Sequence, residues 1–448
     1  MLDSITTLAD NITFDQFGFS AVILKAIKDQ GYTMPTPIQV KAIPVVLAGF
    51  DVIGSAQTGT GKTASFSLPI LQRILPHANK SVSPARHPIR TLILTPTREL
   101  ADQVASNIRL YGKYTELKSA VIFGGVDMNS QIDELCRGVE ILIATPGRLL
   151  DHIQKKIINL GQVQILVLDE ADRMLDMGFL PDLHRIISLL PKERQTLLFS
   201  ATFSNEVKSL ASTYLRNIQM IEVERSNSTN ANVKQIVYNI AEINKQAAVI
   251  QLIRDHSMKK VIIFCNSKIS VNRLSRELEN NGIISSAIHG NKSQIDRTRT
   301  LDAFKRGDIE VLVATDVAAR GLDVVELPVV INFHLPLNAD DYVHRIGRTG
   351  RAGAAGIALS LCGPSERKKL ADIEKLINQT LNIQTLDLNK YRNHCSNRRD
   401  YNTLQHMPSR SYCADEKIAK LSLQSDKKIK RQTAALLGGL INLKEFDR

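Results

Sequence analysis

Residues 51–63 read Asp-Val-Ile-Gly-Ser-Ala-Gln-Thr-Gly-Thr-Gly-Lys-Thr. The first six residues predict a buried strand, and the stretch after Lys62 predicts a helix. The glycines between them allow the backbone to curl, so that its N–H groups and the helix N-terminus face an anion. The positive charge of Lys62 would contact the β- and γ-phosphates of a nucleotide, and the Thr63 hydroxyl would ligate magnesium. The stretch therefore predicts a phosphate-binding loop in an α/β fold.

We expect eight consecutive residues of this loop to contact the nucleotide: Ala56, Gln57, Thr58, Gly59, Thr60, Gly61, Lys62 and Thr63. Ala56 stands where the general G-x-x-x-x-G-K-[ST] pattern has its first glycine. A glycine turn that arose by chance is the alternative interpretation.

The composition is that of an ordinary globular protein, with 448 residues, a net charge of +12 and 43% hydrophobic residues. This length predicts two domains, and the positive charge favours a polyanionic partner such as nucleic acid. Charged residues interrupt every apolar stretch before about 18 residues, so no membrane span is expected. The first ten residues lack the pattern of a secretion signal, and we expect a cytoplasmic protein. The five scattered cysteines predict neither a disulfide framework nor a zinc site.

Short apolar runs recur along the chain and predict buried strands of parallel sheets. The first series covers residues 51–56, 91–95, 120–123, 140–144, 165–168 and 196–199. A polar stretch at residues 224–232 predicts a linker. The second series covers residues 234–240, 261–264, 286–289, 310–314, 329–333 and 356–361, and the strand pattern stops beyond Asn378. Two similar α/β units in tandem are the simplest account.

The end of the chain is basic. From Tyr391 to Arg448 there are 12 Lys/Arg and 6 Asp/Glu, which gives a net charge of +6. This tail could add salt-sensitive attraction to nucleic-acid phosphates, or it could be a solubilising extension that is partly disordered.

Nearly every predicted strand of both units ends in small, hydroxylated or charged residues. Ligands of open α/β sheets bind beyond the carboxyl ends of the strands, so these clusters should line one edge. At one such end, Asp169 is suited to hold hydrated magnesium, and Glu170 is a candidate base for water activation. A solvated acidic cap is the alternative interpretation of this pair.

Residues 344–351 read His-Arg-Ile-Gly-Arg-Thr-Gly-Arg and place three arginines close together in the second unit. A cluster of like charges at a turn is costly unless an anion faces it, although a solvated basic loop is the alternative. Arginines that complete a phosphoryl-transfer site stabilise the charge developing on the γ-phosphate. A nucleotide between the two units would therefore couple their closure to ATP.

Taken together, residues 56–63, 169–172, 200–202 and 344–351 resemble the motifs of the DEAD-box ATP-dependent RNA helicases, with an overall similarity to the bacterial RhlE-type branch. The resemblance implies an α/β fold of two tandem RecA-like domains that bind ATP and RNA across their cleft. It divides the chain into an N-terminal segment with a Q motif (1–40), a first RecA-like domain (41–222), a linker (223–233), a second RecA-like domain (234–378) and a tail (379–448).

The resemblance also assigns roles to single residues. Phe14, Tyr32 and Gln39 would read adenine, because an amide can bond its edge and an aromatic ring can stack on it. Lys62, Asp169 and Glu170 would act in catalysis together with the arginine fingers Arg348 and Arg351, and Asp323 would contact the ribose. The residues that would couple hydrolysis to RNA binding are Asp172, Ser200, Thr202 and His344.

The family motifs that contact RNA correspond here to Pro96, Thr97, Arg98, Gly125, Thr145, Arg148, Arg297, Thr315 and Arg320. Hydroxyls, backbone amides and arginines at strand ends suit sugar and phosphate recognition that does not read sequence. Each of these residues alone has a structural alternative, such as a turn glycine or a surface charge.

The resemblance implies an RNA-stimulated ATPase that unwinds short duplexes or remodels ribonucleoprotein, with ATP and Mg²⁺ as cofactors. Precursor ribosomal particles and the RNA-decay machinery are the partners that such proteins suggest. An ATP-gated RNA clamp or assembly scaffold uses the same motifs and stays open as the alternative. A DNA translocase is disfavoured by the Q motif and by the sequence Asp169-Glu170-Ala171-Asp172. Oligomeric state is left open.

Overall fold

The computed structural model describes residues 12–55, 60–202, 204–222, 233–319, 327–350 and 355–388. Within these ranges the chain forms two lobes, which we call the first lobe (residues 12–222) and the second lobe (residues 233–388). The predicted basic tail beyond residue 388 lies outside the described residues, as do residues 223–232 of the predicted linker.

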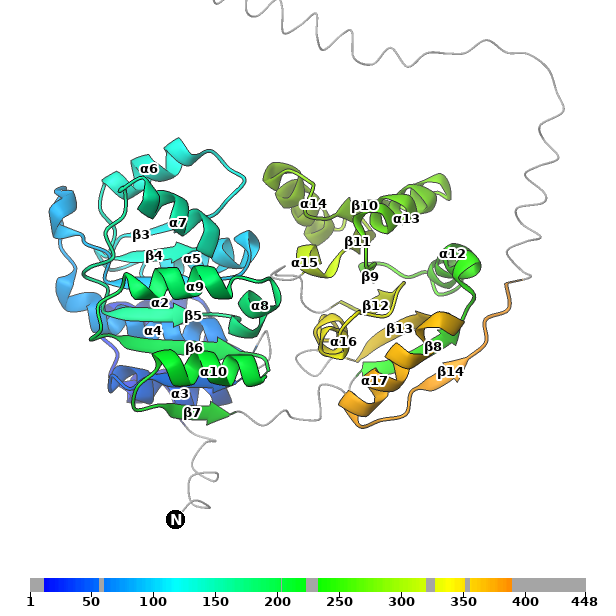
Figure 1. Cartoon of the computed structure of the whole chain (residues 1–448), viewed down its shortest axis with the longest axis horizontal. Helices are drawn as coiled ribbons and strands as arrows, with labels where there is room; N and C mark the ends of the chain where they lie inside the picture. Colours follow the sequence, from blue (N-terminus) through cyan, green and yellow to red (C-terminus); the bar gives the residue numbers. More distant parts are fainter. Residues whose placement is uncertain are drawn as a thin grey trace, which may run out of the picture. The chain divides into compact units, whose positions relative to one another are not determined.

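The first lobe holds one sheet with helices packed against it (Figure 1). Its strands are β1 (Val52–Ser55), β2 (Thr91–Leu94), β3 (Ser119–Ile122), β4 (Ile141–Ala144), β5 (Ile165–Leu168), β6 (Gln195–Ser200) and β7 (Gln219–Glu222). Its α-helices are α2 (Ala21–Asp29), α3 (Pro37–Leu47), α4 (Lys62–Ile74), α5 (Arg98–Tyr111), α6 (Met128–Cys136), α7 (Pro146–Gln154), α8 (Ala171–Asp176), α9 (Leu180–Ser188) and α10 (Asn205–Tyr214). Three 3-10 turns, at Phe14–Phe17, Leu75–His77 and Pro84–Arg86, complete it.

All strand pairs of this sheet are parallel, in the order β3-β4-β2-β5-β6-β1-β7. The register aligns Leu94 of β2 with both Ala144 of β4 and Leu168 of β5. It also aligns Ser55 of β1 with Ser200 of β6. The residues that follow these strands therefore meet at one edge of the sheet, as the sequence predicts.

Both faces of the sheet are buried, which explains why its strands are apolar throughout rather than alternating. Ile93, Ile143 and Val167 pack in one core cluster with residues of α3, α4 and α5. Their strand neighbours Leu92 and Leu166 pack in a second cluster with residues of α7, α9 and α10. The lobe is a sheet between two helical layers, and its loops are left to carry the polar residues.

The second lobe repeats this architecture. Its strands are β8 (Val233–Asn239), β9 (Val261–Phe264), β10 (Ser285–Ile288), β11 (Val311–Ala314), β12 (Val329–Asn332), β13 (Gly356–Cys362) and β14 (Asn382–Gln384). Its α-helices are α12 (Lys245–Asp255), α13 (Lys268–Asn280), α14 (Gln294–Arg306), α15 (Asp316–Ala319), α16 (Ala339–Ile346) and α17 (Arg367–Ile377), with 3-10 turns at Glu242–Asn244 and Pro364–Glu366. The strand order β10-β11-β9-β12-β13-β8-β14 is again fully parallel.

Two strands lie where the sequence predicts none. β7 and β14 are edge strands whose side chains are mostly exposed, so they lack the apolar run that marks a central strand. The statement that the strand pattern stops beyond Asn378 is therefore wrong, because β14 pairs with β8 in the second sheet. The predicted boundary at residue 40 falls inside α3, since residues upstream of it already belong to the core of the first lobe.

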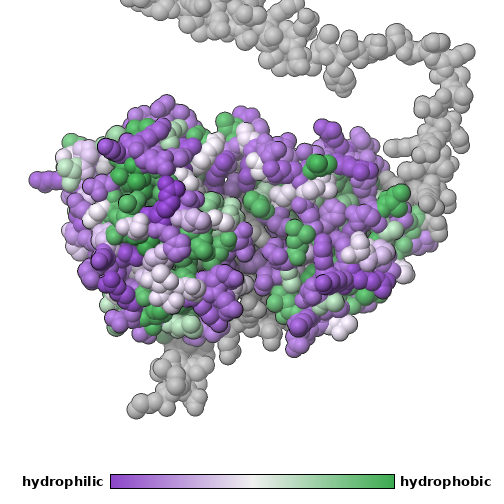
Figure 2. Space-filling model, in the orientation of Figure 1, coloured by the Kyte–Doolittle hydropathy of each residue, from purple (hydrophilic) through white to green (hydrophobic). Residues whose placement is uncertain are grey.

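The face drawn in Figure 2 is largely hydrophilic over both lobes, with apolar residues in small groups. Among the described residues, no helix combines the length and the apolar character needed to cross a membrane.

Candidate nucleotide and RNA site

The phosphate-binding loop leads directly into α4. Gly61 precedes this helix with a φ of 92°, a left-handed conformation that favours glycine, and Lys62 is the first helical residue. Lys62 is only 6% exposed, and its Nζ has no hydrogen-bond partner among the described residues. A buried cation without a hydrogen-bond partner is costly, so this site is suited to an anion that the loop and helix N-terminus also attract.

Asp169 and Glu170 follow the carboxyl end of β5. Asp169 is 3% exposed, and within the described structure its Oδ1 accepts no hydrogen bond. Burial raises the pKa of the Asp169 carboxyl to about 7, against the opposing charge of Lys62. Glu170 has a φ of 53°, which is uncommon for a residue with a side chain and is often found at functional sites.

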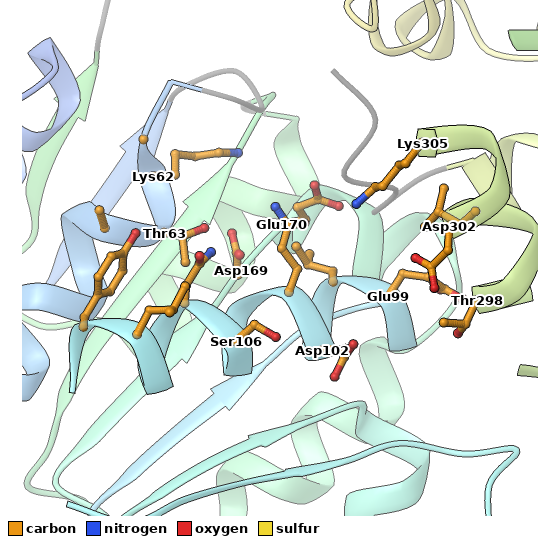
Figure 3. A pocket seen from close by; sticks show the side chains of 18 of the residues that line it. Lys62, Thr63, Glu99, Asp102, Ser106, Asp169, Glu170, Thr298, Asp302 and Lys305 are labelled. Carbon is orange, nitrogen blue, oxygen red and sulfur yellow. The ribbon is translucent and has the colours of Figure 1, made fainter. Parts of the chain in front are cut away.

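A cavity of about 600 Å³ is lined by Lys62, Thr63, Asp169 and Glu170, and Figure 3 shows these residues around it. Its walls also include the exposed side of α5 and residues of α14 in the second lobe, among them Lys305. The residues present fit a nucleotide with Mg²⁺, because an unpartnered buried ammonium and an unpartnered carboxylate oxygen share one cavity. Hydrated magnesium is usually held by one or two carboxylates together with substrate phosphates.

Glu170 forms a buried ion pair with Arg173, three residues later in the chain. Burial alone would raise the pKa of Glu170, but the charges of Arg173, Lys62 and Arg348 outweigh it and lower the pKa to about 2. Glu170 is therefore ionised at neutral pH and weakly basic. In this state it is better suited to orient a water molecule than to remove a proton from it.

Gln39 connects α3 to the phosphate loop. Its Oε1 accepts a hydrogen bond from the Thr36 backbone N–H at 2.9 Å, and its Nε2 donates to the Gly61 carbonyl at 3.2 Å. A glutamine amide has two donor hydrogens and two acceptor lone pairs, so one of each is left for adenine. This geometry is compatible with the predicted contact to adenine. It also connects α3 to the phosphate loop through a hydrogen bond.

The two predicted aromatic residues differ in exposure. Phe14 is 4% exposed and stacks behind Tyr32, with ring centroids 6.3 Å apart. Tyr32 is 39% exposed, lines the cavity, and shares a 3.0 Å hydrogen bond with the hydroxyl of Tyr111. Tyr32 is thus the ring available for base stacking, and Phe14 supports it.

The predicted coupling residues of the first lobe form one hydrogen-bonded unit. Asp172 Oδ2 accepts hydrogen bonds from the backbone N–H of Ala201 at 3.1 Å, and from the backbone N–H and side-chain hydroxyl of Thr202 at 3.0 and 3.1 Å. Ser200 Oγ accepts from the Asp172 backbone N–H at 3.4 Å and donates to the Thr202 carbonyl at 2.8 Å. A shift of α8 would therefore move the end of β6.

His344 and Arg348 of the second lobe line a small cavity together with Glu170, Asp172 and Arg173. This arrangement brings the predicted arginine finger Arg348 and the predicted coupling residue His344 close to the acidic motif. Arg348 is 4% exposed and acts electrostatically on Glu170.

Arg345, the first arginine of residues 344–351, does not face an anionic ligand, which corrects the interpretation of all three arginines as one anion site. Its side chain is 1% exposed and forms two 2.6 Å hydrogen bonds to Asp316. It also donates to the side chains of Asn332 and Asn266 and to the His334 carbonyl. These bonds employ all five guanidinium donors inside the second lobe.

The predicted RNA residues of the first lobe gather at the carboxyl edge of its sheet. The Arg98 guanidinium covers Gly125, and a Cβ built on Gly125 would lie 2.0 Å from Arg98 Nη1. Arg148 donates to the Val126 carbonyl at 3.2 Å. Pro96, Thr97 and Thr145 are buried at strand ends, and the Thr97 hydroxyl caps α5 by accepting from the Leu100 N–H at 3.3 Å.

In the second lobe, Arg297 is 8% exposed and its Nη2 lies 2.7 Å from Glu99 Oε1. Gln294 donates to the same oxygen at 3.2 Å.

Arg98 of the first lobe has a lowered pKa, because it is buried and lies near the positive charges of Arg297 and Arg148. Thr315 directly follows β11 and is half-buried. Arginines that crowd one another in this way favour a polyanionic ligand.

Several predicted site residues lie outside the described residues: Ala56, Gln57, Thr58, Gly59, Arg320, Asp323 and Arg351. Their roles stay predictions. Three contributing residues were not predicted. Arg173 has a sequence signal, because it lies three residues after Glu170 on a short helix. Thr36 has one as well, since Thr-x-x-Gln is a capping box. Tyr111 has none, because only the tertiary fold brings it to Tyr32.

The fold and the site define a phosphate-loop ATPase with two similar parallel-sheet lobes. The family model DEAD/DEAH box helicase matches residues 36–210, and the model Helicase conserved C-terminal domain matches residues 244–353. The chain is 43% identical over 371 residues to the DEAD-box ATP-dependent RNA helicase RhpA of Helicobacter pylori, a match that covers 83% of this chain and 74% of RhpA. It is 42% identical over 378 residues to the ATP-dependent RNA helicase RhlB of Pseudomonas syringae, covering 83% and 94%.

Two solved structures extend the likeness to the whole two-lobe fold. Dbp5 of Saccharomyces cerevisiae bound to RNA and ADP BeF3 has a TM-score of 0.74 and 31% identity, covering 87% of this chain and 99% of that one. Mss116p bound to single-stranded RNA and AMP-PNP has a TM-score of 0.75 and 28% identity, covering 85% and 80%. The chain belongs to the DEAD-box ATP-dependent RNA helicases, which confirms the predicted family and the two RecA-like domains. The RhlE-type branch is not singled out by these relatives and stays a prediction.

Proposed function

We propose that this helicase binds ATP with Mg²⁺ in the cavity beside α4 and RNA across the carboxyl edges of its two sheets. The observation that carries the proposal is the pair of unpartnered buried groups, Lys62 Nζ and Asp169 Oδ1, in one cavity. Membership of the family supports ATP hydrolysis coupled to RNA. The RNA and nucleotide in the related Dbp5 and Mss116p structures support the same two ligands here.

In this proposal Lys62 binds the β- and γ-phosphates, and Thr63 and Asp169 hold the magnesium ion. Magnesium, when bound, neutralises the charge that develops on the transferred phosphoryl group. Glu170 orients the attacking water, and Arg348 stabilises charge on the γ-phosphate. Gln39 and Tyr32 recognise adenine, one by its amide and the other by its ring.

RNA is held through its sugar and phosphate groups by the strand-end residues of both lobes, so binding is insensitive to sequence. The network of Asp172, Ser200 and Thr202 links the acidic motif to β6 and transmits the state of the nucleotide. Precursor ribosomal particles and the RNA-decay machinery are the partners that we propose to test first.

The test is a steady-state ATPase measurement without nucleic acid, with mixed-sequence RNA and with matched DNA, using Glu170→Gln as the blank. Stimulation by RNA and not by DNA, followed by displacement of a strand from a short duplex, is the expected result. Stimulation without strand displacement would favour the RNA clamp. Equal stimulation by DNA would contradict the proposed RNA specificity.

A further inference from the structure

The carboxylate of Glu170 is held by a residue that the family motifs do not explain. Arg173 Nη1 donates to Glu170 Oε2, and both side chains are about nine-tenths buried, at 9% exposure each. Among the described residues, the Arg173 guanidinium donates to Glu170 alone, and Arg173 Nε has no hydrogen-bond partner. The guanidinium is thus committed to the side chain that is proposed to orient water.

The backbone and the ion pair fix the two ends of the Glu170 side chain separately. Glu170 has φ 53° and ψ 54° immediately before the first residue of α8, so its Cα is set by the strand-to-helix turn. Arg173 lies one turn further along α8 and draws the carboxylate toward that helix. A carboxylate oxygen that accepts a buried guanidinium N–H has one lone pair fewer for water, and its charge is balanced.

A second cation lies near the same carboxylate and acts on it electrostatically. Arg348 of the second lobe lines the small cavity that Glu170 and Arg173 share. The cavity that holds Lys62 and Asp169 also reaches Glu170, from the nucleotide side. Glu170 therefore lies between Arg173 of α8 and groups that the ligands and the second lobe bring.

We propose that Arg173 is a positioning residue that holds Glu170 away from the attacking water, and thereby suppresses ATP hydrolysis in the absence of RNA. This inference rests on the role of Glu170 in the proposed function. Binding of RNA and closure on ATP release the ion pair, and Glu170 then accepts a hydrogen bond from water. Arg173 sets the ratio of RNA-stimulated to RNA-free turnover without contacting ATP.

The experiment compares Arg173→Gln with Arg173→Lys in the full-length protein, by steady-state ATPase kinetics with and without saturating RNA. We expect Arg173→Gln to raise RNA-free kcat at least about fivefold, with little change in the KM for ATP or in RNA-stimulated kcat. Arg173→Lys restores the ion pair and should keep RNA-free turnover low. A merely structural residue would not produce this gain, because a destabilised enzyme loses both rates together.

The matched control is Arg185→Gln, which removes another i,i+3 pair of the same lobe, with Asp182 at 3.9 Å on the surface of α9. It should leave both rates unchanged, and thermal unfolding checks that every variant is folded. RNA-free turnover that stays the same or falls in Arg173→Gln overturns the inference. Normal turnover in Glu170→Gln would instead remove the role of Glu170 on which it rests, so the two failures are distinguishable.

Discussion

The side-chain amide of Gln39 joins the N-terminus of α3 to the carbonyl of Gly61, the residue immediately before Lys62. The Q motif is thus part of the support of the phosphate loop as well as a candidate adenine reader. Gly61 has little room for change, because an added Cβ would lie 2.5 Å from Gln39 Nε2. In the proposed function, adenine and phosphate recognition are therefore mechanically connected through Gln39.

We expect Gln39→Ala to weaken ATP binding by about tenfold, since it removes one or two hydrogen bonds of roughly 0.5–1.5 kcal/mol each and the adenine contact. Isothermal titration with ATP measures the affinity. Gln39→Glu keeps the acceptor for Thr36 but replaces both N–H donors with a negative charge beside the phosphate loop, so it should weaken ATP binding at least as much. An unchanged affinity in both variants would contradict the bridging role.

Because the Lys62 ammonium has no hydrogen-bond partner, replacing Lys62 should affect ATP binding and thermal stability differently. Lys62→Met should abolish ATP binding, whereas the thermal stability of the nucleotide-free protein should not fall. The physical reason is that the buried ammonium has no hydrogen-bond partner, so its removal relieves a desolvation cost that offsets the lost attraction to Asp169 and Glu170. Differential scanning fluorimetry with and without Mg²⁺-ATP gives both answers, and a large loss of stability without nucleotide would argue for a structural role.

Gly125 has a φ of +77° beneath the Arg98 guanidinium. Gly125→Ala should lower RNA affinity by about tenfold or more, because displacing a guanidinium can cost a charge-assisted bond of about 1.5–3 kcal/mol. Fluorescence anisotropy with a labelled single strand measures this loss. Basal ATP hydrolysis should change little, because Gly125 lies on the proposed RNA face.

Gly178 offers a matched control, because its φ is +78° and nothing lies within 4 Å of an added Cβ. Gly178→Ala carries a similar backbone strain of about 1–2 kcal/mol and should leave RNA binding intact. Equal losses of RNA affinity in both variants would assign the effect to strain rather than to Arg98.

The three hydrogen bonds that end on Asp172 Oδ2 predict a separation of hydrolysis from strand displacement. Thr202→Val removes only the hydroxyl donor, keeps the shape, and should reduce unwinding more than ATP turnover. Asp172→Ala leaves three donors without their acceptor and should also destabilise the first lobe, by about 1–3 kcal/mol. Parallel ATPase and duplex-displacement assays check this, and equal losses in both activities of Thr202→Val would contradict it.

The buried network of Arg345 predicts a stability effect rather than a catalytic one. Arg345→Met leaves the partly exposed carboxylate of Asp316 without its cation and three further acceptors without a donor, so it should destabilise the second lobe by at least about 1–3 kcal/mol. Chemical denaturation measures this loss. Arg348→Met should instead reduce turnover more than it lowers stability, and a reversal of these two outcomes would exchange the proposed roles of the two arginines.

The sequence by itself determined the class and the order of the fold. Twelve of the strands follow apolar runs, because a parallel sheet buried on both faces needs continuous apolar residues. It also determined the chemistry of residues 51–63 and the place of Asp169 and Glu170 at a strand end, since those depend on local residue type and spacing. Edge strands such as β7 and β14 carry no such signal, because one side of them faces solvent.

The tertiary structure alone decided how deeply each site residue is buried and which hydrogen-bond partners it has. Arg345 and Arg348 are three residues apart with the same side chain, yet one is held inside the second lobe and the other lines the cavity of Glu170. Packing likewise buries Phe14 and leaves the Tyr32 ring exposed, although the sequence gives both the same predicted role. Burial and hydrogen-bond partners are set by packing between elements, and residue spacing along the chain does not encode them.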